Sequence, residues 1–303
     1  MLKKVQVIAV FLFFFFMLPI IAGLLPFPNN EKYKPPIVEE EKQVVFASTE
    51  VTTQETPTPD APPIEEIVTD VTPPVDSFDV LFVFTHSHET YKPFVESEKG
   101  TVAVYDDQSN LLTMSQVMED YFKLNGLNAK TLDVDVMSVM KQKGLTMSSA
   151  YKTVRPYISK ELQQNSYDLV LDIHRDATKA DKSTVSHNNV KYAKVAFVIG
   201  AENPNYKQNL SYANPLSQTM NQIIPNISRG IIEKKGAGVD GVYNQDLSKG
   251  LLLIEIGGID NTEDEVYRTV AVLAQAISKT FMNQQLVKNA EATKPNTNDS
   301  NEL

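Results

Sequence analysis

Three of the four histidines in this chain, together with two glutamates, are of types and spacings that suit a hydrolytic metal site. His86, His88 and Glu89 fall within four residues, whereas His174 and Glu255 lie much further along the chain. A hydrolytic zinc ion takes three protein ligands and leaves one position open for water, and imidazole with carboxylate is a common ligand set. The sequence has no cysteine, so histidine and carboxylate must supply the ligands. We expect His86, Glu89 and His174 to bind Zn²⁺.

Glu255 is the predicted general acid and base of this site. A bound zinc ion lowers the pKa of a coordinated water to about 7, and a second carboxylate then takes the proton and returns it to the departing amine. Glu255 follows an apolar run, which would raise the pKa of its carboxyl toward the working range. His88 stays an open alternative, because it could replace Glu89 as a ligand or lie beside the ligands.

Other hydrolytic chemistries fit the sequence less well. The chain contains no Gly-x-Ser-x-Gly turn of the kind that a serine hydrolase of the α/β class uses. The pair Gly257-Gly258 follows an apolar run but lacks the spacing of a phosphate-binding loop. A two-carboxylate glycosidase could use Glu89 and Glu255, but that scheme leaves the histidines unexplained. A histidine at a strand end is more often structural than a ligand when taken alone, so the metal interpretation depends on the combination of residues.

Short apolar runs immediately precede the reactive residues and predict buried β-strands. His86 comes two residues after a run that ends at Phe84, His174 directly follows Ile173, and Glu255 directly follows Ile254. The carboxyl ends of strands in an open α/β sheet share one edge, where ligands bind, so distant segments would meet in one cleft. The predicted strands are 79–84, 129–134, 169–173, 195–199 and 251–256.

Longer amphipathic stretches lie between these runs and predict helices. Thr262 and Glu265 stand at capping-box spacing and predict the start of the last of them. Alternation of this kind argues for an α/β fold, a single domain whose mostly parallel, twisted sheet is covered by helices on both faces. The predicted helices are at about 113–125, 148–163, 207–223 and 262–283.

The N-terminal segment predicts a membrane anchor. Lys3 and Lys4 precede an uncharged run from Val5 to Asn29, and about 20 such residues are needed to cross a bilayer. The two lysines predict a cytoplasmic N-terminus, so residues 1–27 would form a cytoplasmic stub and one transmembrane helix, with the rest exported. A cleaved signal peptide is the alternative, although its apolar core would be only about 7–15 residues long.

Composition divides the remainder of the chain. Residues 28–77 contain nine of the 17 prolines and most of the acidic excess, which predicts a disordered linker. Residues 285–303 are polar and predict a disordered tail. Residues 78–284 are left as one catalytic domain, long enough to bury a sizeable core. The net charge of −10 argues against nucleic acid as a partner, because no basic patch is available for phosphates.

Five ordered motifs across residues 78–284 resemble the stage II sporulation protein P family. This family is similar to the zinc-dependent N-acetylmuramoyl-L-alanine amidases, which cut the amide between the lactyl group of muramic acid and L-alanine. Laying the family pattern His-Thr-His-x-x-Glu-Ser-Tyr on this chain favours His86 and Glu89 over His88 as ligands, with His174 third and Glu255 as the acid/base. Phe84 and Thr90 depart from that pattern. The motifs are Thr85–Tyr91, Asp172–Ala177, Ser228–Ile231, Tyr243–Ser248 and Leu253–Gly258 with Asn261-Thr262.

The resemblance implies a setting and partners. A protein of this family would be held by a single membrane span, with its catalytic domain in the septal intermembrane space. It would degrade septal peptidoglycan during endospore engulfment, beside a lytic transglycosylase and other septal sporulation proteins. Arg175 and Arg229 lie in the motifs and could hold carboxylates of the peptide stem, with structural salt bridges as the equal alternative. Asn244 and Asp246 are expected to form a turn. Two other functions stay open: a peptidoglycan endopeptidase using the same site, and a cell-wall-binding scaffold without turnover.

Overall fold

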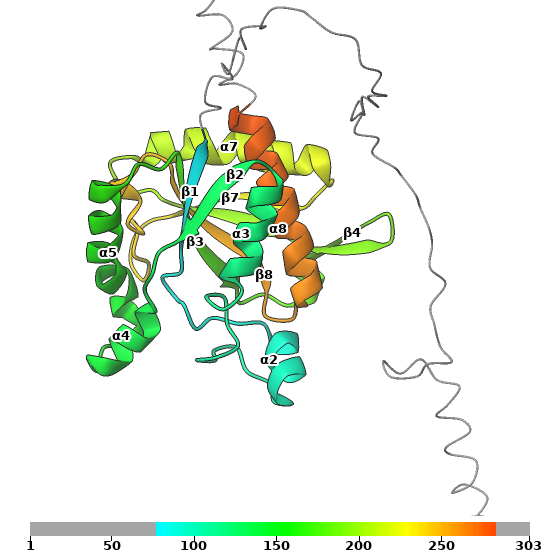
Figure 1. Cartoon of the computed structure of the whole chain (residues 1–303), viewed down its shortest axis with the longest axis horizontal. Coiled ribbons are helices and arrows are strands. Elements are labelled where there is room, and N and C mark those ends of the chain that lie inside the picture. Colours follow the sequence, from blue (N-terminus) through cyan, green and yellow to red (C-terminus); the bar gives the residue numbers. More distant parts are fainter. Residues whose placement is uncertain (1–76, 283–303) are drawn as a thin grey trace, which may run out of the picture. The chain divides into compact units, whose positions relative to one another are not determined.

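A six-stranded sheet forms the centre of the computed structural model, which describes residues 77–282 (Figure 1). Its strands lie in the order β2-β1-β3-β8-β6-β7, and the pairs β1–β2, β1–β3, β3–β8 and β6–β7 are parallel. Only the β6–β8 pair within this sheet is antiparallel. The expected α/β fold with a mostly parallel sheet is therefore confirmed. The strands are β1 Phe78–Val83, β2 Leu127–Thr131, β3 Leu169–Asp176, β6 Val195–Gly200, β7 Ser228–Lys234 and β8 Leu251–Gly258.

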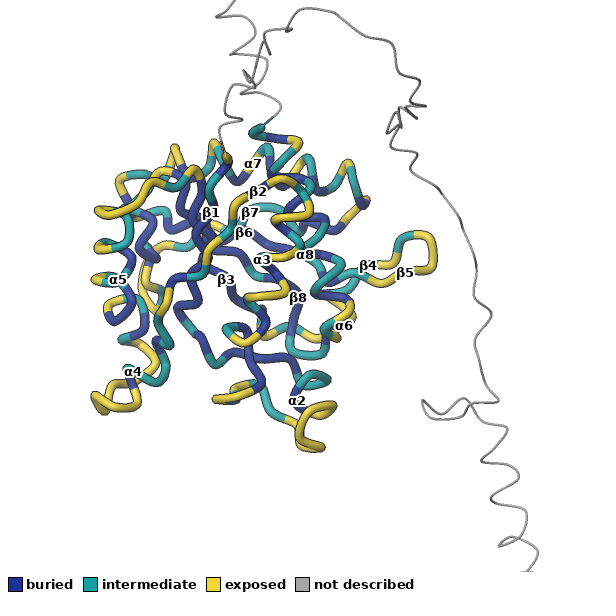
Figure 2. The backbone as a smooth tube through the Cα atoms, viewed as in Figure 1, coloured by how far each residue is buried: buried dark blue, intermediate teal, exposed yellow. Residues whose placement is uncertain are grey.

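Helices cover both faces of this sheet, as the sequence predicts. Side chains alternate along β1, so Val80 and Phe82 join one core while Leu81 and Val83 join another on the opposite face. The first core is closed by α3, α7 and α8, and the second by α4 and α5 (Figures 1 and 2). The helices are α2 Lys92–Lys99, α3 Ser115–Leu124, α4 Val136–Gln142, α5 Ala150–Gln164, α6 Ala180–Ser183, α7 Tyr206–Ile223 and α8 Glu263–Ile277.

The start of α8 follows the predicted capping box. The Thr262 side chain accepts a hydrogen bond from the backbone N–H of Glu265, and the Glu265 carboxylate accepts one from the backbone N–H of Thr262. Asn261 links this cap to the preceding strand, because its side chain donates to Glu265 and accepts from the backbone N–H of Gly258. The helix cap therefore fixes the end of β8, three residues beyond Glu255.

Some elements were not predicted from the sequence. Strand β7 was missed because it is a partly exposed edge strand whose apolar residues, Ile231 and Ile232, form only a short run. A two-stranded antiparallel hairpin, β4 Thr184–His187 with β5 Val190–Ala193, projects from the domain (Figure 1). Its turn residues, Asn188 and Asn189, both have positive φ, which asparagine tolerates better than most residues.

Several predicted segments lie outside the described residues. These are the anchor (1–27), nearly all of the linker (28–77) and the tail (285–303). Within residues 77–282, no helix combines the length and apolar character that a bilayer crossing requires. The helix α7, with 18 residues, carries polar side chains along much of its length.

Candidate active site

The sheet brings the predicted reactive residues to neighbouring strands. His86 and Glu89 lie in the turn that follows β1, and β1 pairs with β3. His174 on β3 is directly paired with Glu255 on the adjacent β8. Because side chains alternate along a strand, His174 and Glu255 face the side of the sheet covered by α5, whereas Ile173 and Ile254 face the opposite core.

His174 is buried between two carboxylates. Its Nδ1 lies 3.5 Å from Oε2 of Glu89, and its Nε2 lies 3.1 Å from Oδ1 of Asp172. The ring of His86 approaches edge-on, with its centroid 5.2 Å from that of His174. The first two contacts make a compact polar cluster on the face of the sheet that α5 covers. Asp172 was not among the predicted site residues, although it stands two residues before His174 and therefore on the same face of β3.

The surroundings raise the pKa of His174 and lower those of Glu89 and His86. Burial alone would lower the pKa of His174, but the carboxylates of Asp172 and Glu89 raise it well above its ordinary value. Burial would raise the pKa of Glu89, yet His174 and Arg175 hold it below its ordinary value. Burial and the nearby His174 lower the pKa of His86, which favours the neutral imidazole.

Glu255 differs from the other acids of the cluster. Burial raises the pKa of its carboxyl to about 7, because the surrounding strand offers few groups that stabilise the charge. Its Oε2 is buried and has no hydrogen-bond partner among the described residues. A carboxyl with a pKa near neutrality can both accept and return a proton at physiological pH, which suits a general acid–base role.

The cluster fits the donor set of a zinc ion in part. Five buried side-chain N or O atoms lack a hydrogen-bond partner within residues 77–282, and three of them belong to this group of residues. His86 Nδ1 is free to bind an ion, Glu255 Oε2 is free to exchange a proton, and His174 Nε2 faces Asp172. Two ligands of a tetrahedral zinc ion lie about 3.3–3.6 Å apart, which matches the distance between Glu89 Oε2 and His174 Nδ1. Among the described residues, however, no three histidine or acidic side chains are arranged to hold a metal ion. His86, Glu89 and His174 are thus brought together without completing a site.

Tyr151 lines the cluster and Tyr243 packs against Tyr151, and neither residue was predicted. The Tyr151 ring of α5 stacks on His174 at 6.2 Å and meets His86 edge-on at 5.6 Å. The Tyr243 ring lies 5.1 Å from that of Tyr151. Burial and nearby carboxylates raise the pKa of Tyr151 well above its ordinary value, so its hydroxyl stays protonated. The two rings form an apolar wall. The sequence of α5 alone does not indicate this wall.

A short loop holds Tyr243 in place. Arg155 on α5 donates two hydrogen bonds to the Asp246 carboxylate, at 2.8 and 2.6 Å, and a third to the Asn244 side chain at 3.1 Å. Asn244 also donates to the backbone carbonyl of Tyr151, and its φ of 56° places it in the left-handed region. Asn244 and Asp246 lie in a tight turn and anchor it to α5.

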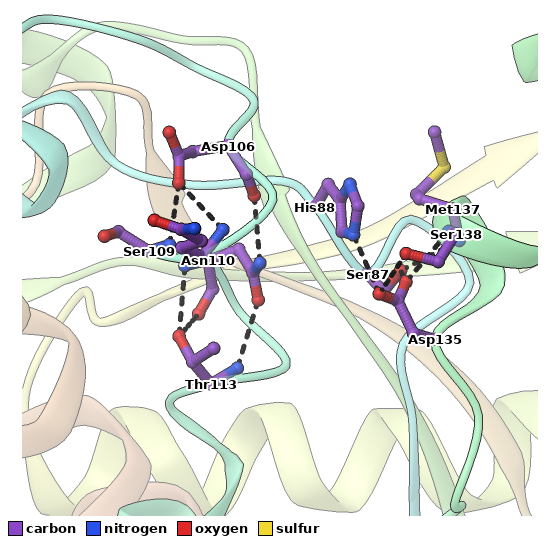
Figure 3. A network of polar contacts seen from close by, with 10 residues as sticks. Ser87, His88, Asp106, Ser109, Asn110, Thr113, Asp135, Met137 and Ser138 are labelled. Carbon is purple, nitrogen blue, oxygen red and sulfur yellow. Dashed lines mark hydrogen bonds and ion pairs between the residues drawn. The ribbon is translucent and has the colours of Figure 1, made fainter. Parts of the chain in front are cut away.

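His88 takes part in a separate network (Figure 3). Its Nε2 lies 3.0 Å from Oδ2 of Asp135, the residue that caps the N-terminus of α4. The same carboxylate accepts hydrogen bonds from the Ser87 hydroxyl and from both the backbone and the hydroxyl of Ser138. The turn that carries His86 and Glu89 is therefore tied to α4 through the two residues between them.

The two candidate substrate-binding arginines have different surroundings. The buried guanidinium of Arg175 donates to the carbonyls of Thr90 and Val104, at 2.9 and 2.6 Å, and lies over the Tyr105 ring. Its backbone N–H donates to Oε2 of Glu89 at 3.2 Å, beside a register shift in the β3–β8 ladder. Arg229 forms an ion pair with Asp176. A role for either residue in binding substrate stays a prediction.

The Asp135 network leads to a prediction for pH-dependent stability. Hydrogen bonds from Ser138, Ser87 and His88 outweigh burial and hold the pKa of Asp135 well below its ordinary value. A carboxyl whose pKa is depressed in the folded state stabilises the fold at pH values above its unfolded-state pKa of about 3.9. This contribution is lost as the pH falls through the folded-state pKa. Asp135→Asn keeps a capping oxygen but removes the charge, so the bonds from Ser87 and Ser138 weaken. The free energy of unfolding should therefore fall by about 1 kcal/mol at pH 7.

Urea denaturation at several pH values measures this effect. The difference between the wild type and Asp135→Asn should be constant above about pH 5 and shrink below about pH 4. Asp133→Asn, a change of the same kind at an exposed position two residues earlier, should have little effect. A difference for Asp135→Asn that stays the same down to pH 3 would contradict the assignment.

Comparisons with known proteins identify relatives of this chain. Residues 27–278 match the sequence profile of the family described as Stage II sporulation protein P. The Stage II sporulation protein P of Bacillus subtilis (strain 168) is 30% identical over 213 residues, which are 70% of this chain and 53% of that protein. The chain thus spans about half the length of this curated relative.

Solved structures with a similar arrangement have low sequence identity. The CwlD amidase from Clostridioides difficile, solved in complex with the GerS lipoprotein, is 11% identical with a TM-score of 0.44. That match covers 70% of this chain and 100% of the CwlD chain. The N-acetylmuramyl-L-alanine amidase Ami1 from Mycobacterium smegmatis is 10% identical with a TM-score of 0.41, covering 69% of this chain and 98% of Ami1.

Proposed function

This chain belongs to the stage II sporulation protein P family, and from that premise we propose that it is a zinc-dependent N-acetylmuramoyl-L-alanine amidase of the sporulating cell. Its substrate would be septal peptidoglycan, and the bond cut would be the amide between the glycan and the stem peptide. The observation that carries this proposal is the direct pairing of His174 with Glu255 across β3 and β8, with Glu89 Oε2 3.5 Å from His174 Nδ1. Two potential zinc ligands and a potential proton carrier therefore lie together in one buried cluster.

His86, Glu89 and His174 would hold the zinc ion, leaving Glu255 free for proton transfer. Bound zinc would act as a Lewis acid and make water nucleophilic at neutral pH. Glu255 would accept a proton from the attacking water and deliver it to the departing amine nitrogen, which is possible because its pKa of about 7 lets both forms exist. Tyr151 and Tyr243 would exclude bulk water from one side of the cluster and orient the substrate against it.

The proposal includes a location. Residues 1–27 would anchor the protein in the cell membrane with the N-terminus inside, and residues 28–77 would let the domain reach the septal wall. A lytic transglycosylase would act beside it on the glycan strands. Cell fractionation tests the anchor, since a protein recovered without the membrane would contradict it.

Digestion of purified cell walls tests the reaction. We expect the full-length chain to release stem peptides with a free L-alanine amine, identified by mass analysis of the products. A chelator should abolish release, and added zinc should restore it, because no other group in the cluster can activate water as strongly. Cleaved crosslinks with intact glycan–peptide amides would instead indicate an endopeptidase. Binding to insoluble walls without any release would indicate a scaffold, and either result would overturn the proposed amidase.

A further inference from the structure

Asp172 is a buried acid at the centre of the sheet that the proposed reaction does not use. Asp172 is 1% exposed. It stands two positions before His174 on β3 and therefore on the same face of the sheet. A carboxylate is costly to bury unless its oxygens are hydrogen-bonded. Here Oδ1 accepts from the backbone N–H of Thr85 at 3.0 Å, and Oδ2 accepts from the Thr85 hydroxyl at 2.7 Å.

These contacts connect the two segments that carry the histidines. Thr85 immediately precedes His86, so the carboxylate of Asp172 fixes the backbone where the His86 turn leaves β1. The same Oδ1 atom lies 3.1 Å from Nε2 of His174. One carboxylate group therefore contacts both the start of the turn and the imidazole of the neighbouring strand.

The two nitrogens of His174 face different kinds of partner. Nδ1 lies 3.5 Å from Glu89 Oε2, which is the spacing of two ligands of one tetrahedral ion. Nε2 lies beside Asp172, whose two oxygens both accept hydrogen bonds from Thr85. A histidine that binds a metal through one nitrogen commonly donates its other N–H to a carboxylate, which fixes the tautomer and the ring orientation.

We propose that Asp172 is a positioning residue of the metal centre, accepting the Nε2 proton of His174 so that Nδ1 is the nitrogen presented beside Glu89. This inference rests on the proposed zinc-dependent function. In this structure the distance from His174 Nε2 to Asp172 Oδ1 is short enough for a hydrogen bond, but the angle is not. The χ2 torsion of histidine has broad minima, so the ring has freedom to turn toward the carboxylate.

Zinc affinity of Asp172 variants tests the inference on the full-length chain, with zinc ion as the probe and a chromophoric chelator as competitor. Asp172→Asn should raise the zinc Kd about 10-fold and Asp172→Ala about 100-fold, the range found when carboxylate partners of metal-bound histidines are removed. Asn can still accept from the Thr85 N–H, so this variant should keep the fold. Asp168→Asn is the matched control, because its carboxylate accepts a β1 N–H (that of Asp79) at the other end of β3. Its zinc Kd should be unchanged.

A purely structural role for Asp172 predicts a different pattern. Lower melting temperatures with an unchanged zinc Kd in both variants would overturn the inference while leaving the proposed function intact. Nitrogen NMR of the zinc-loaded wild type gives a second readout that needs no variant: we expect the His174 proton on Nε2 and the metal on Nδ1. A proton on Nδ1 would overturn the inference even if Asp172→Ala fails to fold. A wild type that binds no zinc would overturn the proposed function, and the inference with it.

Discussion

Replacing Glu255 by glutamine is expected to lower the rate of peptidoglycan hydrolysis by about 10²–10⁴-fold, the usual contribution of a general acid–base. Glutamine has nearly the same shape but cannot take a proton from water or return one to an amine. The three proposed ligands are untouched, so the zinc content should stay at one ion per chain. The measurement is the initial rate of wall solubilisation together with metal analysis of the same sample.

Stability distinguishes lost chemistry from lost folding in this variant. Burial raises the pKa of Glu255 to about 7, so the folded protein holds the proton more strongly than the unfolded chain does. Ionisation of Glu255 therefore destabilises the wild type as pH rises from the unfolded pKa of about 4.3 to about 7. At pH 8 the metal-free Glu255→Gln protein should be at least as stable as the metal-free wild type.

A second glutamate provides the matched control. Glu263 lies in the first turn of α8, outside the cluster, and Glu263→Gln should leave the rate unchanged. Wild-type rates from a folded, zinc-loaded Glu255→Gln protein would remove Glu255 from the reaction.

Replacing His174 by alanine is expected to abolish stoichiometric zinc binding and to reduce hydrolysis to background. His174 supplies one of only three proposed ligands, and a catalytic zinc site needs all three. The change also leaves the buried carboxylates of Glu89 and Asp172 without the imidazole that lies between them. Metal analysis after dialysis against zinc-free buffer measures the effect directly.

A histidine outside the cluster is the control for this change. His187 lies in the projecting hairpin, so His187→Ala should keep one zinc per chain and the wild-type rate. Unchanged zinc occupancy in a folded His174→Ala protein would exclude His174 as a ligand.

Five of the six strands of the sheet could be predicted, because the pattern that marks a buried strand is local in the sequence. Apolar runs such as Leu169–Ile173 and Leu251–Ile254 are long enough to mark buried strands without reference to the rest of the chain. The rule that ligands bind at the carboxyl ends of parallel strands then placed His174 and Glu255 at one edge. The structure pairs these two residues directly, which the sequence pattern does not specify.

The surroundings of the cluster could not be predicted, because they depend on tertiary contacts. Tyr151 reaches the histidines only because α5 packs on the face of the sheet that His174 occupies. The contacts of Arg175 with the Thr90 and Val104 carbonyls depend on a loop with no periodic pattern. Asp172 was within reach of sequence reasoning, since strand alternation places it beside His174, but its Thr85 partner follows only from the pairing of β1 with β3.

Anomalous scattering at the zinc edge, from crystals of the zinc-loaded protein, tests the central claim most directly. The claim is that His86, Glu89 and His174 hold one ion with Glu255 beside it. We expect a single strong peak about 2.0–2.2 Å from one donor atom of each of the three ligands. A peak bound by other residues, or the absence of any peak in this cluster at saturating zinc, would contradict the account.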